Sequence, residues 1–271
     1  MLFGEFAKCQ AEAEYPELWQ GLVGAWSPCL SPRGGTVLRD LSGRGNHGTL
    51  TNISGAQFVI SHGLQGLDYA LENSSIASIV LPEFAPGEFS AVLWCITRGQ
   101  AGGGTADGIF TRDDLSSNRV FSIDIPATNL VTGRIWNSSG VLSSVSSTTT
   151  TLDGRPHLCS NTLGGGKHRF FVDLALAGSA SLSGDVKTAT NNICIGSFGS
   201  GVVGRYFDGI AFEAMLFRRD VSLDIPLLYR LCPGGWATPR RRRWNYATAQ
   251  TAIPYWVFAR KNARLIGGGV S

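Results

Sequence analysis

The chain has few charged side chains, and its last 38 residues contain no acidic residue. Charged residues make up 16% of the 271 positions, against about 25% in an average soluble protein. Segment 234–271 carries seven of the 23 Lys and Arg, which leaves 16 basic against 20 acidic side chains in residues 1–233. The sequence therefore predicts a neutral-to-acidic body with a basic tail. Because such a body repels phosphate, we expect no nucleic-acid partner.

Closely spaced cysteines and long hydrophobic runs are also lacking. The six Cys lie at positions 9, 29, 95, 159, 194 and 232, so neither a CxxC redox site nor a zinc cluster can form from neighbours in sequence. Cys95, Cys159 and Cys194 fall in apolar runs, which favours buried free thiols. No run approaches the ~20 apolar residues of a membrane span, and the N-terminus lacks the pattern of a signal peptide. We expect no membrane partner and no export by a signal of its own.

Short strand-like runs are what the body contains instead. Runs rich in β-branched and aromatic residues are separated by Gly, Asn, Asp and Ser turns, at 75–81, 89–96, 119–125, 168–176 and 205–217. In the last run, alternation predicts one face made of Ile210, Phe212, Ala214 and Leu216. Only Ser222–Leu231 is helical in pattern, with Ser222 as N-cap and Asp224 in the first turn. These features predict an all-β fold of two packed sheets.

Five segments of this body resemble a known family. PELWQGLVGAW at 16–26 and DLSGRGNHGTLTN at 40–52 resemble the opening strand and loop of a concanavalin A-like lectin/glucanase domain of the laminin-G-like type. RPHL at 155–158, FFVDLAL at 170–176 and RYFDGIAFEAMLFRRDVS at 205–222 resemble its later strands. The resemblance covers about residues 16–232 and implies a two-sheet jelly-roll sandwich. We therefore expect an N-terminal arm at 1–20, where Tyr15-Pro16 favours an extended entry, a sandwich domain at 21–233 and a C-terminal arm at 234–271.

The end of the chain resembles a second pattern. LCPGGWATPRRRRW at 231–244 is similar to the Trp- and Arg-rich extension attached to laminin-G-like domains in bacteriophage genomes. That resemblance implies a component of a virus particle, which reaches the outside of the host by lysis.

The DLSGRGNHG loop offers oxygen ligands of the kind that Ca²⁺ prefers, from Asp40 and Asn46. The alternative is a tight turn in which Gly43, Gly45 and Gly48 take positive φ and Asp40 bonds the local backbone. No other cofactor is expected.

Sugar binding on a sandwich needs an exposed aromatic ring beside polar side chains. Trp136 with Asn137, near the loops of Asp107 and Asp113-Asp114, is the candidate. The alternative is that Trp136 packs in the core or at its rim.

Catalysis is not expected. Glycoside hydrolysis needs paired carboxylates, and the E-x-D-x-x-E strand of the glucanase relatives is missing. The body Glu residues lie singly, at 72, 83, 88 and 213, and the four His, at 47, 62, 157 and 168, lack metal-ligand spacing.

The tail combines cations with aromatic rings, as expected of a segment that docks onto a protein surface. The alternatives for its arginine run are contact with nucleic-acid phosphates and a solvated run of charge. The predicted anchoring residues are Arg240, Arg241, Arg242, Arg243, Trp244, Tyr255, Trp256 and Phe258. Burying two of its apolar side chains would contribute several kcal/mol, at about 1.5 to 3 kcal/mol each.

Together these features predict a non-enzymatic structural protein on the surface of a phage particle, as a capsid decoration or fibre-like protein. Its expected partners are other virion proteins, sister subunits in a homo-oligomer, and host glycans. The alternative is an independent carbohydrate-binding or glycoside-hydrolase-like module.

Overall fold

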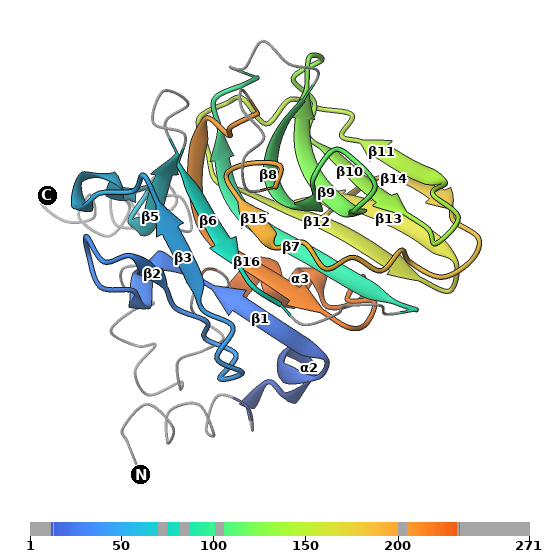
Figure 1. The fold of residues 1–271 in the computed structure, drawn as a ribbon, viewed down its shortest axis with the longest axis horizontal. Coiled ribbons are helices and arrows are strands. Elements are labelled where there is room, and N and C mark those ends of the chain that lie inside the picture. Colours follow the sequence, from blue (N-terminus) through green and yellow to red (C-terminus); the bar gives the residue numbers. More distant parts are fainter. Residues whose placement is uncertain are drawn as a thin grey trace, which may run out of the picture.

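The structure is a computed structural model that describes residues 14–69, 75–81, 87–100, 106–199 and 205–231, together with Glu12 and Pro233. Two antiparallel sheets pack face to face (Figure 1). This confirms the predicted all-β, two-sheet sandwich. The predicted anchoring arm at 234–271 lies outside the described residues, as do Cys9 and Cys232.

The first sheet has the strand order β14-β13-β12-β7-β16-β5-β4, and β1 pairs with β16. Its strands are β1 (Leu22–Trp26), β4 (Phe58–Ser61), β5 (Leu64–Tyr69), β7 (Phe89–Thr97), β12 (His157–Gly164), β13 (Lys167–Val172), β14 (Ala175–Ser181) and β16 (Gly209–Phe217).

The second sheet has the order β11-β10-β9-β8-β15-β6-β3-β2. Its strands are β2 (Val37–Leu38), β3 (Gly48–Thr51), β6 (Ile76–Ile79), β8 (Ala106–Asp113), β9 (Arg119–Pro126), β10 (Thr132–Trp136), β11 (Leu142–Ser146) and β15 (Ile193–Ile195). The helical elements are α2 (Pro16–Trp19), α3 (Ile225–Leu231) and the 3-10 turns η1 (Pro28–Leu30) and η2 (Gly55–Gln57).

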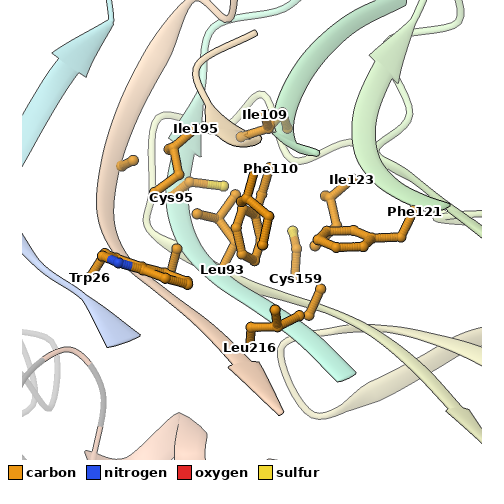
Figure 2. Packing of buried hydrophobic residues seen from close by; sticks show 14 of the residues in the cluster. Trp26, Leu93, Cys95, Ile109, Phe110, Phe121, Ile123, Cys159, Ile195 and Leu216 are labelled. Atoms are coloured by element: carbon orange, nitrogen blue, oxygen red, sulfur yellow. The ribbon is translucent and has the colours of Figure 1, made fainter. Parts of the chain in front are cut away.

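The main core fills the space between the sheets (Figure 2). Phe110 of β8 packs edge-on against both Trp26 and Phe121, with ring centroids 6.2 and 5.4 Å away. Cys95 and Cys159 lie in this core as buried free thiols, as their apolar neighbours predicted. Cys194 is buried and free as well.

A second apolar cluster lies on the outer face of the first sheet. Val92, Trp94 and Ile96 belong to this cluster, whereas the residues between them on β7 face the main core, because successive side chains of a strand point to opposite faces. Helices α2 and α3 cover this outer face, with Leu18 and Leu228 fully buried. The end of the predicted N-terminal arm thus packs on the folded body. Tyr15 is non-helical, with φ of −137°, as its place before Pro16 predicts, and the short helix α2 begins at Pro16.

The predicted one-sided face of β16 is wrong in part. A bulge between Ala211 and Glu213 shifts the register against β7. Ala214 and Leu216 face the main core, but Ile210 and Phe212 lie in the outer cluster. An extra residue in a strand reverses its alternation, which the sequence pattern did not reveal.

Two further boundaries differ from the predictions. Helix α3 begins at Ile225 rather than just after Ser222, because the Asp224 carbonyl accepts the first helical bond, from the Leu228 N–H. The run at 168–176 is two strands joined at Asp173, whose φ of 56° turns the chain. Asp tolerates this left-handed conformation better than most residues.

Candidate functional site

The Asp40 loop is a hydrogen-bonded turn that ties β1 to the loop before β3. Asp40 Oδ1 accepts from the N–H groups of Ala25 and Ser42, at 3.0 and 2.8 Å. Its Oδ2 accepts from the Ser42 hydroxyl and the Asn46 N–H, at 2.8 and 3.0 Å. Four donors therefore surround the carboxylate, which satisfies its charge without a cation.

Asn46 is used in the same way. Its side-chain amide donates to the Val23 carbonyl, 2.9 Å away, and its own carbonyl accepts from Trp26 Nε1 at 2.6 Å. Gly43 and Gly45 have φ of 75° and 79°, as the turn interpretation predicts, but Gly48 lies in β3 without positive φ. Asp40 and Asn46 thus take part in the hydrogen bonds that shape the turn.

The predicted sugar platform at Trp136 is buried. Trp136 as a residue is only 5% exposed, and the Arg119 guanidinium lies 5.6 Å from its ring centroid. Asp107, at the start of β8, is fully buried. The predicted sugar site at Trp136 required an exposed aromatic ring, and the structure presents none at this position.

Asn137 supports a neighbouring loop instead of facing solvent. Its side-chain amide donates to the Ser183 carbonyl at 2.7 Å, and its Oδ1 accepts from the Val141 N–H at 2.7 Å. The backbone N–H groups of Ser138 and Lys187 donate to the carbonyls of Asp185 and Trp136. The turn after β10 and the loop at 183–188 are thereby fixed to each other.

Those two segments border a hollow of about 480 Å³, which we call the β10 hollow. It is lined by Gly87, Ser138, Asp185, Val186, Lys187 and Thr188. Ligand pockets commonly have volumes of about 300 to 1,000 Å³. One carboxylate, one ammonium group and two hydroxyls line the hollow, so it can both accept and donate hydrogen bonds.

A charged cluster lies near the same end of the sandwich, on β8, β9 and β10. Asp124 Oδ1 lies 3.3 Å from Arg134 Nη2, and Asp113 Oδ1 lies 3.5 Å from Arg119 Nε. Burial raises the pKa of both carboxyl groups to about 6. Perturbed carboxyls are common in functional sites, but these side chains are 1% and 0% exposed, so a substrate could not reach them.

A Ser-His-Asn arrangement lies between the sheets. His168 Nε2 and Nδ1 are 2.7 Å from Asn161 Oδ1 and 2.8 Å from the Ser143 hydroxyl. The Asn161 amide nitrogen donates to the carbonyls of Ser122 and Arg134, so its oxygen must accept from Nε2–H and the Ser143 hydroxyl must donate to Nδ1. All three side chains are at most 5% exposed, and burial lowers the pKa of His168 to about 4. This arrangement joins β11, β12 and β13 as a structural network.

His157 is the other histidine with a strong electrostatic environment. Its Nδ1 and Nε2 each lie 2.9 Å from a carboxylate, of Asp173 and Asp153 respectively. Hydrogen bonding to Asp173, and then to Asp153, raises the pKa of His157 to about 9. His157 is therefore a cation that joins β12 to the β13–β14 turn.

Sequence reasoning did not find the β10 hollow. Asp185 and Lys187 are ordinary surface residues in a loop, and bonds to Trp136, Asn137 and Ser138 bring that loop against the β10–β11 turn. Within the described residues, no group of three or more His, Cys, Asp and Glu is placed to hold a metal ion. No helix among them is long and apolar enough to cross a membrane.

Comparison with protein-family models and with curated proteins gave no match. Solved structures of similar fold were found. The binding domain of Paraclostridial Mosquitocidal Protein 1 aligns with a TM-score of 0.61 at 12% identity, over 78% of this chain and 52% of that chain. A botulinum neurotoxin type C structure, described as interacting with two ganglioside molecules, gives a TM-score of 0.59 at 11% identity, over 79% and 52%.

A Trypanosoma rangeli sialidase in complex with sialic acid gives a TM-score of 0.52 at 13% identity, over 77% of this chain and 32% of that chain. This chain thus spans about half the length of the toxin structures and about a third of the sialidase. Likeness at such low identity concerns the fold alone. The chain folds as a two-sheet β-sandwich similar to part of those toxin structures and of that sialidase.

Proposed function

We propose that this protein is a non-enzymatic, glycan-binding sandwich displayed on a bacteriophage particle, and that the β10 hollow holds the sugar. The observation that carries the binding proposal is the hollow itself, a depression of about 480 Å³ whose mixed polar and apolar lining has both hydrogen-bond donors and acceptors. Sugar hydroxyls need such mixed partners. The toxin and sialidase structures, whose descriptions name gangliosides and sialic acid, support the same ligand class.

The absence of catalysis is part of the proposal. Glycoside hydrolysis requires an acid and a second carboxylate on either side of the scissile bond. Asp185 is the single acidic residue among those that line the hollow, and the raised pKa values belong to Asp113 and Asp124, which are buried. Binding without turnover is the chemistry that these positions support.

The particle assignment rests on the sequence. The resemblance of residues 231–244 to extensions in phage genomes supports it, and the basic, aromatic tail supports anchoring through residues 234–271 to a capsid, tail or sister subunit. The proposal predicts that the protein sediments with gradient-purified particles of the virus that encodes it, where mass spectrometry would detect it. Its absence from such particles would refute this part of the proposal alone.

A glycan array followed by titration calorimetry tests the binding site. Asp185→Ala and Lys187→Ala should each weaken the best ligand at least tenfold, because a hydrogen bond to a charged group contributes about 1.5 to 3 kcal/mol. Arg155→Ala is the matched control, since that side chain is 77% exposed and does not line the hollow. Equal binding by all three variants would exclude the hollow, and release of reducing sugar would contradict the non-enzymatic assignment.

A further inference from the structure

Strand β11 is the edge strand of the second sheet, at the side of the sandwich where β14 ends the first sheet (Figure 1). β11 pairs with β10 in regular register, from Thr132 opposite Ser146 to Trp136 opposite Leu142. β14 is less regular, because Ala177 is an extra residue between the pairs made by Phe170 and Phe171. A bulge hinders pairing at an edge, so β11 is the edge that remains available.

The backbone of β11 is oriented for pairing with another strand. The Ser147 N–H donates to the Val131 carbonyl, and the Asn137 N–H donates to the Val141 carbonyl. In an antiparallel ladder the bonded pairs alternate with unbonded ones, so the odd-numbered residues of β11 bond to β10. The N–H and C=O groups of Leu142, Ser144 and Ser146 therefore point to the outer edge.

Charge does not protect this edge. Residues 137–152 contain no Asp, Glu, Lys, Arg or Pro, which are the residues that natural proteins use to prevent edge-to-edge pairing. Val141 and Leu142 are 55% and 46% exposed. An uncharged strand with outward backbone groups and exposed apolar side chains fits a partner of the same character.

The opposite side of the sandwich is protected. There the first sheet ends in β4, where Arg33 donates to the Phe58 carbonyl at 2.8 Å. The second sheet ends in β2, which has only two residues and is followed by Arg39. Short strands and cationic side chains are standard protections for a sheet edge. β11 itself contains neither a cation nor a proline, and the cation nearest to it in the ladder is Arg134 of β10, which lies opposite Ser144 on the inner side of the edge.

We propose that β11 is a docking strand for a second copy of this chain. Pairing β11 with its own copy, antiparallel across a two-fold axis, joins the two second sheets into one continuous sheet. Full overlap of the five residues places Ser144 opposite Ser144 of the copy and Leu142 opposite Ser146. This register keeps the exposed residues on one face, as the period of a strand requires.

A second copy is favoured over another partner for two reasons. Residues 137–152 contain no charged side chain that could attract a charged partner, and an uncharged strand can pair with its own copy without charge repulsion. Two-fold pairing is also the commonest arrangement of soluble homo-oligomers.

Sedimentation of the full chain over a range of concentrations tests the proposal. The wild type should form a dimer. Ser144→Lys and Ser144→Glu should each raise the dissociation constant at least about 100-fold, because like charges would lie directly opposite each other at the centre of the pair. An equimolar mixture of the two variants should form a dimer again, which no folding defect could mimic.

Thr49→Lys is the control, because Thr49 is an exposed residue of β3, distant in the same sheet, and it should dimerise like the wild type. A monomeric wild type would overturn the proposal. So would a Ser144→Lys variant that dimerises with unchanged affinity, or a mixture that stays monomeric.

Discussion

Acid should destabilise this protein through His168, and the effect can be calculated from the structure. His168 is fully buried, and this burial lowers its pKa in the folded state to about 4 from the ordinary value of 6.5. Between these two values the unfolded chain binds a proton that the folded chain does not. The contribution of His168 to stability therefore rises with pH across this window and is lost as the pH falls through it. Asp113 and Asp124, whose pKa values are raised to about 6, contribute in the opposite direction, so the His168 effect is measured against a variant that lacks it.

The magnitude follows from the size of that shift. Each pKa unit corresponds to about 1.36 kcal/mol, so the full loss approaches about 3 kcal/mol, of which about 2 kcal/mol is lost by pH 4.5. A total stability of about 5 to 15 kcal/mol makes this loss easy to measure. Urea unfolding between pH 7.5 and 4.5 would give the free energy at each pH.

The variant His168→Gln isolates the effect. Glutamine can still donate to Asn161 and accept from Ser143 but has no titrating group, so the wild type should lose about 2 kcal/mol relative to this variant on going to pH 4.5. His62→Asn is the control, because His62 is exposed and its φ of 52° suits asparagine. Equal pH dependence in wild type and His168→Gln would refute the reasoning.

Three further results are expected. Raising the pH should lower the free energy of unfolding of the wild type more than that of His157→Gln, because the pKa of His157 is raised to about 9. The stabilisation by protonated His157 is complete below pH 6.5 and is lost as the pH rises through 9. Unfolding of both proteins at pH 7 and 9.5 would show this. Asp40→Asn should lower the unfolding free energy by about 2 to 4 kcal/mol, because an amide nitrogen would face the donors that now surround Oδ2, and EDTA should leave the melting temperature of the wild type unchanged. A chain that ends at Pro233 should stay folded but lose its association with virus particles; undiminished association would rule out anchoring by residues 234–271.

The sandwich could be predicted from the sequence because the pattern of short strands and glycine-rich turns is local information. The turn at Asp40 could also be predicted from the sequence. Asp40 and Asn46 bond to residues of β1, and both segments belong to the stretch that resembles the laminin-G-like domain. Gly48 was misassigned because its conformation is set by pairing with Ile79 of β6, far along the chain.

The errors share one physical cause. Trp136 is buried in a fold that places Arg119, 17 residues earlier in the chain, beside its ring, and whether Phe212 faces the main core depends on a bulge against β7. Both depend on neighbours in space. The β10 hollow was missed for the same reason, since three separate segments border it.

The two proposed interactions, glycan binding and pairing through β11, meet at one turn but can be separated. Ser138 lines the β10 hollow, and β11 begins four residues later. Three bonds within the turn, between Asn137, Gly140 and Val141, hold its shape from the side of β10, so pairing at the outer edge of β11 should leave the hollow unchanged. Across the two-fold axis the hollows would lie at opposite ends of the paired strands, roughly 14 Å apart at least, given about 3.4 Å per residue. A Ser144→Lys monomer should therefore bind a single glycan as tightly as the wild type. It should lose only the avidity that a dimer with two binding sites gains on a surface that carries many glycans.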